Sequence, residues 1–477
     1  MQQDDLEYFK SEEFQEILNQ YESSVKSGVS IYMDADDLAD IADWYQYNNR
    51  HEEAEEAITL AFQYNPEAVG PLLYRAREAI TIKDYETALE YASKIEPLDA
   101  LEAFYLRNEI LISEGKEEEA DEHFREYLKE VPLDEQVDYV FDVANLYVEY
   151  MIYDKAIEWL ARSRGDDSDD FKELLARGFF GVGNYKDSER IFNELIDHNP
   201  YSSRYWNALA SAQFMREDYH AAITSSEFAI AIDPNDTDGL LSKANSLYNL
   251  ENYESALVFF KKYTEKKPDE EYGYLHQGTC LINLGRHQEA IELLEKGESL
   301  SSPDSQYLPE IYQELGFAYG ELHQPDSAIY YLDKADLLPN SDHVNIGIMK
   351  GHVLLSNKRA DEAEEAFREA VLNAEDKAKA MLRVIVSLYD NRFVNQAYIL
   401  LKRFFTVYED YHEGYSYMAL CCIDLEKDKE FMKYLKLATE KNPKEARLIL
   451  GHFFPKDMEP KDYYEHAQKQ LKKKNKK

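Results

Sequence analysis

Small residues recur along this chain with a period close to 34 residues, and this repeat constrains the fold more than any other feature. One column of the repeat is occupied by Ala54, Ala88, Ala120, Ala156, Ser188, Ala222, Ala256, Ala290, Ala328, Ala363, Ala397 and Phe431. A second column, twelve residues earlier, is occupied by Ala42, Ala76, Asn108, Ala144, Ala176, Ala210, Ala244, Gly278, Gly316, Gly351, Ile385 and Ala419. Self-similarity of this length is typical of solenoids, in which each repeat packs only on its neighbours.

Residues 203–236 show what a single repeat predicts. The first apolar face of this stretch is formed by Trp206, Leu209, Ala210 and Gln213, spaced three or four residues apart as on one side of a helix. A second helical stretch opens at Tyr219, and Pro234 ends it, because the residue before a proline is pushed out of the helical region. Two helices joined in this way pack closely only if the side chains at their crossing, Ala210 and Ala222, are small. One hairpin cannot bury its apolar faces alone, so neighbouring hairpins are expected to stack.

The sixth unit resembles the tetratricopeptide repeat at nearly every signature position of that family. The matching residues are Trp206, Leu209, Ala210, Ala222, Ala229 and Pro234, with Ala210 in the glycine position and Gln213 in the first tyrosine position. Aligned on the alanine column, the units begin near Ala35, Val69, Leu101, Val137, Asp169, Ser203, Thr237, Glu271, Pro309, Val344, Ala378 and His412. The chain is thus similar to stand-alone arrays of this family in bacteria. The resemblance implies an all-α fold, a right-handed α-solenoid of about twelve tetratricopeptide-like helical hairpins with helical caps.

The resemblance divides the chain into residues 1–34 as an N-terminal capping helix, 35–445 as the array of repeats, and 446–477 as C-terminal capping helices and a Lys-rich tail. The first segment predicts a helix from Leu6 to Lys26. Its apolar stripe consists of Phe9, Ile17, Leu18, Tyr21 and Val25. Such helices shield the outermost repeats, which need one polar face. Whether the array hinges at its longest interruption, Ser299–Leu308, is left open.

The charge of the chain limits its partners. The formal net charge is −41, from 94 acidic against 53 basic residues, and so acidic a surface repels nucleic acid and anionic membranes over most of its length. The exception is a basic tail formed by Lys469, Lys472, Lys473, Lys474, Lys476 and Lys477. Two interpretations stay open: a solvated tail that complements the acidic body and the helix dipole, or a contact with nucleic acid, ribosome or membrane.

Neither a membrane anchor nor a secretory signal is expected. No stretch approaches the ~20 apolar residues of a membrane span, and the start, residues 1–5, is acidic without an apolar core. The cysteines, Cys280, Cys421 and Cys422, have neither metal-ligand spacing nor a paired framework, so they are interpreted as core residues. These features predict a cytoplasmic location.

The sequence offers no catalytic motif. Its twelve histidines form no His-x-x-x-His or His-Glu-x-x-His pair, and there is neither a glycine-rich phosphate loop nor a Gly-x-Ser-x-Gly elbow. Gly178, Gly181 and Gly183 fall at a helix end and a turn rather than between a strand and a helix. The chain is therefore expected to be no enzyme and to hold neither a cofactor nor a metal.

In the family that the chain resembles, the first helices of the hairpins line a concave groove that holds peptides or partner helices. The residues expected to bind the partner there are Arg177, Arg204, Asn207, Ser211, Phe214, Asn245, Tyr248, Asn249, Tyr272, Thr279 and Asn283, with Leu241 and Leu275 beside them. Asparagines both donate and accept hydrogen bonds, and the aromatic residues supply apolar contact. Upstream, the face is acidic through Asp36, Asp43, Glu102, Glu109, Asp138, Glu149, Asp170 and Glu173, against only Arg77 and Arg177. The alternative is that all of these are ordinary solvent-facing residues.

One function within the family can be weighed directly. Repeats that bind chaperone C-terminal carboxylates carry a clamp of lysine, asparagine and arginine, but here Asn207 and Leu241 stand at the lysine positions, and only Asn245 matches. No chaperone carboxylate clamp is therefore expected. The favoured function is a non-catalytic protein-interaction scaffold or adaptor that binds a peptide or helical segment, more basic or neutral than acidic, in the groove. The alternatives are a self-assembling structural protein, or nucleic-acid or ribosome contact through the tail.

Overall fold

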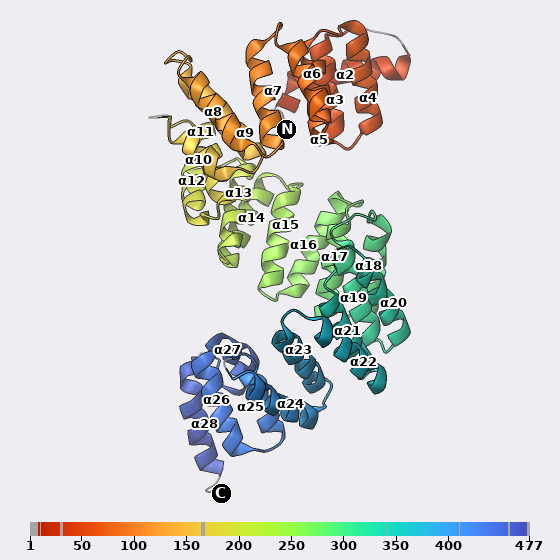
Figure 1. Cartoon of the computed structure of the whole chain (residues 1–477), viewed down its shortest axis with the longest axis vertical. Coiled ribbons are helices and arrows are strands. Elements are labelled where there is room, and N and C mark those ends of the chain that lie inside the picture. The colour runs from red at the N-terminus through yellow and green to blue at the C-terminus, as the bar shows by residue number, and fades with distance from the viewer. Residues whose placement is uncertain are drawn as a thin grey trace. The chain divides into compact units, whose positions relative to one another are not determined.

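The computed structural model describes residues 8–9, 11–28, 32–163, 167–339, 341–409, 411–456 and 458–474 (Figure 1). This described part contains 27 α-helices, one short 3-10 helix and no strand. Contacts within the chain divide it into two compact units, Met1–Ile232 and Asp233–Lys477, and each is described by itself. The three-segment division expected from the sequence stays a prediction.

The first unit consists of a leading helix followed by six helical hairpins. Its helices are α2 (Glu12–Ser27), α3 (Ala35–Tyr47), α4 (His51–Tyr64), α5 (Val69–Thr81), α6 (Tyr85–Ile95), α7 (Ala100–Ser113), α8 (Glu117–Leu128), α9 (Gln136–Glu149), α10 (Tyr153–Leu160), α11 (Asp169–Gly181), α12 (Tyr185–His198), α13 (Ser203–Met215) and α14 (Tyr219–Ile232). The odd-numbered helices from α3 onward are the first helices of their hairpins.

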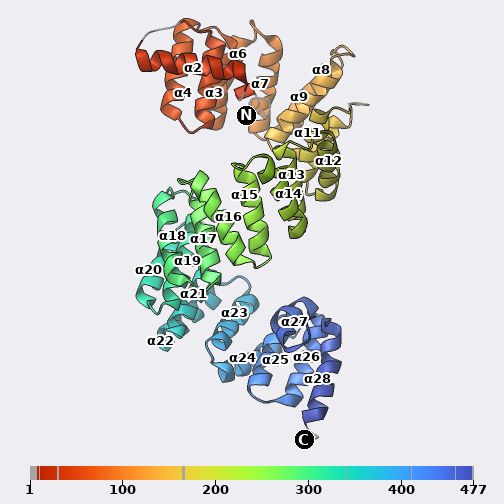
Figure 2. The ribbon, with the colours of Figure 1, turned by 180° about the vertical axis from the view of Figure 1, so that it is seen from behind.

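The second unit continues with six more hairpins and a terminal group of helices (Figure 2). Its helices are α15 (Thr237–Asn249), α16 (Tyr253–Lys266), α17 (Glu271–Asn283), α18 (His287–Leu300), α19 (Leu308–Glu321), α20 (Pro325–Asp336), α21 (His343–Ser356), α22 (Ala360–Asn373), α23 (Lys377–Asp390), α24 (Val394–Val407), α25 (Tyr415–Asp424), α26 (Asp428–Lys441), α27 (Pro443–Leu450), the 3-10 helix η1 (Gly451–Phe453) and α28 (Pro460–Lys474). The twelve hairpins confirm the predicted all-α solenoid.

The two small-residue columns lie where the helices of each hairpin cross. Every residue of the second column is buried, and so is every residue of the first column except Phe431, which is half-buried. Asn108 shows how a larger polar residue is accommodated in the second column. Its Oδ1 lies 2.9 Å from Nδ1 of His123 on the partner helix, and its Nδ2 donates to the carbonyl of Phe104 at 2.8 Å. The crossing therefore tolerates a polar side chain when its hydrogen bonds are satisfied.

Each of the twelve hairpins turns through one residue in the left-handed conformation, directly after the first helix. These residues are Asn49, Lys83, Gly115, Met151, Gly183, Glu217, Glu251, Gly285, His323, Lys358, Arg392 and Glu426, with φ between 53° and 77°. The next amide donates to the carbonyl five residues before it, as Asp218 does to Gln213 at 2.9 Å. This Schellman arrangement ends the helix and satisfies its last carbonyls. A repeated backbone motif, rather than glycine, thus sets the hairpin turn.

The N-terminal helix differs in detail from the expectation. α2 begins after Ser11, whose hydroxyl accepts from the amide of Phe14 at 3.1 Å, and the expected start at Leu6 lies outside the described residues. The predicted stripe is wrong at Val25, which is 54% exposed, and it omits Phe14, which is fully buried. The helix is rotated so that Phe14, Leu18 and Tyr21 meet α3 and α4 in one apolar cluster.

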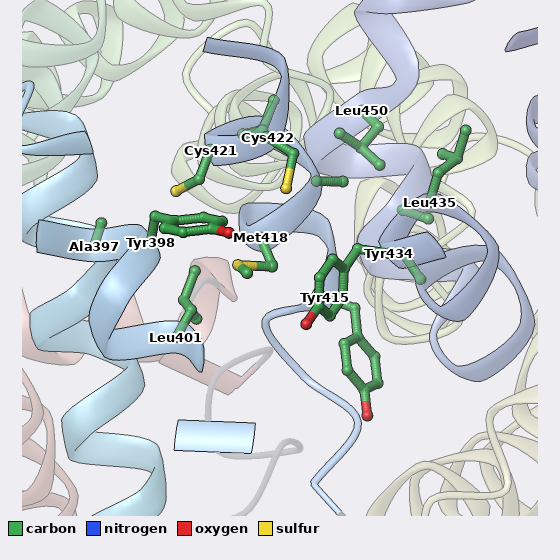
Figure 3. Close-up of a cluster of buried hydrophobic side chains, with 14 of the residues drawn as sticks. Ala397, Tyr398, Leu401, Tyr415, Met418, Cys421, Cys422, Tyr434, Leu435 and Leu450 are labelled. Atoms are coloured by element: carbon green, nitrogen blue, oxygen red, sulfur yellow. The ribbon is translucent and has the colours of Figure 1, made fainter. Parts of the chain in front are cut away.

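The C-terminal helices bury the predicted core cysteines. Cys421 and Cys422 lie in a cluster with Tyr398, Met418 and Leu450 (Figure 3). Burial raises the pKa of the Cys421 thiol to about 12, so it stays protonated and unreactive at neutral pH. The core interpretation of the cysteines is confirmed, because all three, Cys280 included, are buried. Of the Lys-rich tail, Lys469 is exposed on α28, whereas the side chains of Lys472, Lys473, Lys474, Lys476 and Lys477 lie outside the described residues.

Candidate partner-binding surfaces

In the first unit, the first helices place Arg77 among several carboxylates. Arg77 on α5 has its Nε 3.6 Å from Oε2 of Glu109 on α7, and Asp43, Glu102 and Glu149 act on it from α3, α7 and α9. Burial lowers the pKa of Arg77, but these carboxylates outweigh it and hold that pKa above its ordinary value. The helices on which the predicted acidic groove residues lie therefore do bring their charges together.

A second group of acids lies beside the first. Burial raises the pKa of Asp142, the hydroxyl of Tyr105 donates to it at 3.3 Å, and Asp138 and Glu102 raise that pKa further by repulsion. Carboxylates that raise one another's pKa lack sufficient positive charge nearby. We name as the acidic face the set Asp43, Glu102, Glu109, Asp138, Asp142 and Glu149 around Arg77. Asp142 was missed in the sequence because its place in the repeat, one helical turn after Asp138, was not among the positions expected to line the groove.

The two arginines predicted for the groove belong to a small cavity in the first unit. The cavity, of about 30 Å³, is lined by Phe141, Asn145, Asp170, Glu173, Leu174, Arg177 and Arg204. Arg204 forms an ion pair with Glu173, whose side chain is buried, and its guanidinium lies 5.3 Å from the ring centroid of Tyr205. A space of this size holds one or two waters and no larger ligand. The ion pair therefore holds Arg204 in the wall of the first unit.

The remaining predicted residues of this unit lie on α13. The Ser211 hydroxyl donates to the carbonyl of Asn207 at 3.0 Å, and Phe214 packs edge-on against Tyr219 of its own hairpin with centroids 5.4 Å apart. The same aromatic contact joins Phe180 to Tyr185 at 5.3 Å and, in the second unit, Tyr248 to Tyr253 at 5.3 Å. An aromatic residue at this position thus stabilises its hairpin as well as facing outward.

In the second unit, four of the predicted residues form one neighbourhood on α15 and α17. The Tyr272 hydroxyl donates to Oδ1 of Asn245 at 3.2 Å, and Nδ2 of Asn283 lies 3.5 Å from the Tyr248 hydroxyl. His276 lies between them, with its ring centroid 4.2 Å from Tyr272 and 6.3 Å from Tyr248. We name as the aromatic face the set Asn245, Tyr248, Tyr272, His276, Asn283 and Tyr307.

Some predicted contacts on this face serve the fold instead. Thr279 is 4% exposed and donates to the carbonyl of His276 at 3.0 Å, while Leu275 is fully buried, so neither presents a side chain to a partner. The amides of Asn249 and Asn283 donate to carbonyls of their own helices, at 2.9 and 2.8 Å. Asn249 has a second N–H, and the amides of both asparagines have a carbonyl oxygen, so both keep capacity for a partner.

Sequence reasoning missed two acids that complete the aromatic face. Glu310 and Glu314, one turn apart on α19, act electrostatically on Tyr272 and Tyr248. Burial, aided by Glu310, raises the pKa of Glu314 to about 7. The available signal was the repeat itself, because Glu314 stands at the same place in its repeat as His276, with a four-residue insertion between them.

The described residues contain no group of three or more histidine, cysteine, aspartate or glutamate side chains that could hold a metal ion. Within the same ranges, none of the helices combines the length and apolar character that crossing a membrane requires.

Models of protein families match parts of this sequence. Models of the tetratricopeptide repeat match residues 174–237 and 348–382, and a model of the anaphase-promoting complex, cyclosome, subunit 3 matches residues 206–297. A protein STIP1 homolog of Dictyostelium discoideum is 33% identical over 143 residues, covering 30% of this chain and 25% of the relative. Lipopolysaccharide assembly protein B of Haemophilus influenzae is 23% identical over 199 residues, covering 41% of this chain and 49% of the relative. The chain spans about half or less of these relatives.

Solved structures of MamA are also similar. MamA from Desulfovibrio magneticus shares 18% sequence identity, and the match covers 36% of this chain and 96% of that chain with a TM-score of 0.34. Another crystal structure of MamA shares 20% identity over 37% of this chain and 94% of that chain, with a TM-score of 0.33.

Proposed function

Because this chain is a tetratricopeptide repeat protein, we propose that it is a non-catalytic scaffold that binds a segment of a partner protein on its first helices. The acidic face of the first unit is the principal contact. The observation that carries this proposal is the position of Arg77, on which carboxylates from α3, α7 and α9 all act.

The chemistry of the acidic face favours a basic segment. Burial and, to a lesser extent, neighbouring acids raise the pKa values of Asp142 and Glu102. A cation that binds beside either carboxylate is therefore stabilised by it. A formal net charge of −41 adds long-range attraction that speeds association and weakens with salt. A C-terminal carboxylate of a chaperone would be repelled by the same field, which argues against a carboxylate clamp.

The asparagines and aromatic residues of the original prediction keep a secondary place in the proposal. Asn207, Asn245 and Asn249 lie on first helices and offer hydrogen bonds to an extended backbone without reading its sequence. They add neutral contacts, while the acidic face supplies the preference for charge.

Neutralising part of the acidic face tests the proposal. The variant Glu102→Gln/Asp138→Asn/Asp142→Asn keeps the shape of the side chains and removes three charges. We expect its affinity for a fluorescein-labelled 15-residue Lys/Arg-rich peptide to fall about 10- to 100-fold, because each carboxylate is worth ~0.5–1 kcal/mol. Fluorescence anisotropy at 50 and 300 mM salt measures both the affinity and its salt dependence.

The matched control is Glu86→Gln/Glu90→Gln/Glu122→Gln, which removes the same charge from exposed positions on the second helices α6 and α8. The control should lose no more than about threefold in affinity, the effect of net charge alone. Equal losses in both variants, or no loss in the first, would show that the acidic face is not the binding site.

A further inference from the structure

The aromatic face of the second unit meets two carboxylates to which the described part of the chain offers no partner. No described residue donates a hydrogen bond to Glu314 or Glu310 or forms an ion pair with either, although Glu314 is half-buried. Half-burying a carboxylate without a partner is unfavourable, and proteins usually pair such a group. Glu314 therefore lacks a counter-charge among the described residues, and the exposed Glu310 one turn before it adds to the negative charge.

The surroundings of these carboxylates are rings rather than cations. Glu314 acts electrostatically on Tyr248 of α15 and Glu310 acts on Tyr272 of α17. Tyr307, which directly precedes α19, lies 5.2 Å from Tyr272 between ring centroids and so brings the start of α19 against that ring. His276 could supply a charge, but burial lowers its pKa to about 4, and its ring stacks on Phe260 at 5.2 Å. At neutral pH this histidine is uncharged and held by its stack.

We propose that Glu310, Glu314, Tyr248 and Tyr272 form a site for one arginine side chain of the bound partner, a proposal that rests on the scaffold function above. The guanidinium stacks on a tyrosine ring and donates to the carboxylates of α19. Asn245, held by the Tyr272 hydroxyl, lies beside the site to contact the backbone of the same segment.

The chemistry selects arginine rather than lysine. A guanidinium is planar and weakly hydrated, so it loses little on entering a half-buried aromatic site, and it binds a carboxylate through two parallel hydrogen bonds. A lysine ammonium is compact and strongly hydrated, and it meets only one oxygen at a time. Contact between a cation and a tyrosine face adds a further preference for a positive group.

The test compares three peptides on the full-length protein at pH 8. Each is a labelled 15-residue Gly/Ser/Asn peptide that differs only at its central residue, which is arginine, lysine or citrulline, the uncharged isostere of arginine. We expect the arginine peptide to bind at least tenfold more tightly than the citrulline peptide, with lysine between them. In Glu314→Gln this preference should fall to less than about twofold.

Two controls separate a lost site from a lost fold or a lost scaffold. Glu321→Gln changes an exposed glutamate at the end of the same helix and should keep the full arginine preference. The neutralised variant of the acidic face should keep the arginine-to-citrulline ratio of the wild type. An unchanged arginine-to-citrulline ratio in Glu314→Gln would overturn this site and leave the scaffold proposal standing. Equal binding of the three peptides by the wild type would also overturn it.

Discussion

Single residues in this protein divide into those that the fold has satisfied and those that it has not. Asn108, at the crossing of α7 and α8, is 1% exposed but fully bonded to His123 and Phe104. Glu314 is less buried yet has no described hydrogen-bond or ion-pair partner. A satisfied polar group stabilises its contact, whereas an unsatisfied one costs free energy in the absence of a ligand. For this reason we interpret Asn108 as a structural residue and propose Glu314 as a binding residue.

The raised pKa of Glu314 predicts a pH effect on stability. Its pKa is about 7 in the folded chain against an ordinary 4.5, so between these values the folded state holds a proton that the unfolded state has lost. Stability from this group is present below pH ~4.5 and is lost as the pH rises towards 7. Glu310 from the same helix raises this pKa further, and Tyr248 of α15 lies within electrostatic range of Glu314.

Replacing this acid should remove the effect. We expect Glu314→Gln to be more stable than the wild type at pH 8, on the order of 1–2 kcal/mol after solvent screening, and equal to it near pH 4.5. Urea unfolding at both pH values, followed by circular dichroism, measures the two differences, with Glu321→Gln as the control. A constant difference between the variants at both pH values would contradict the assignment.

At the scale of the elements, the hairpin is the unit that the sequence encodes. A first helix ends in a Schellman motif, a left-handed residue turns the chain, and the second helix packs back across a column of small residues. Nine of the twelve left-handed residues are not glycine, so the turn conformation is imposed by helix termination and packing. The crossing of the two helices is the position in the hairpin that least tolerates a larger side chain.

At the crossing of α21 and α22, Gly351 allows the cost of a larger side chain to be measured. A Cβ at Gly351 would overlap the ring of Phe367. Alanine normally favours a helix over glycine by ~1 kcal/mol, but here we expect Gly351→Ala to destabilise the second unit by about 1–3 kcal/mol. Thermal unfolding followed by circular dichroism gives the change.

Gly297→Ala is the matched control, because the same atom is added to a helix of the same unit with its nearest neighbour, Cδ1 of Ile311, at an ordinary 3.4 Å. This substitution should be neutral or slightly stabilising. If Gly351→Ala stabilised the protein as much as the control does, Phe367 would be free to move aside and the crossing would not be tight.

At the scale of the whole molecule, stability is a sum of local terms. Buried residues gather in several clusters, such as those around Leu38, Trp159 and Leu315, rather than in one core. A chain of this kind is held together by contacts between neighbouring repeats, and its cooperativity falls with length.

We therefore expect thermal unfolding to depart from two-state behaviour. Differential scanning calorimetry should give a van't Hoff enthalpy below the calorimetric enthalpy, because parts of the array unfold at different temperatures. Gly351→Ala should shift only the part of the transition that belongs to the second unit. A single transition with equal enthalpies, shifted as a whole by this substitution, would mean that the chain unfolds as one cooperative body.

The sequence by itself determined the repeat, the helix pairs and the acidic character of the first helices. These are local properties: small residues at a fixed spacing allow close crossing, and proline and polar breaks end helices within the same few residues. Several helix starts, such as Ser203 and Tyr219, could therefore be located before the structure was known. The charges around Arg77 followed from the same periodicity.

Only the tertiary structure decided which side chains are exposed and which helices share a site. Successive residues on a helix point about 100° apart, so an error of one position in the face moves Leu275 and Thr279 from the surface into the interior. That angle is set by how neighbouring hairpins pack. His276 and Glu314 were both missed because the place that they share in their repeats was not among the positions expected to line the groove. Stacking of the hairpins brought this acid within electrostatic range of Tyr248 of α15, and no local pattern records an interaction between residues so far apart in the chain.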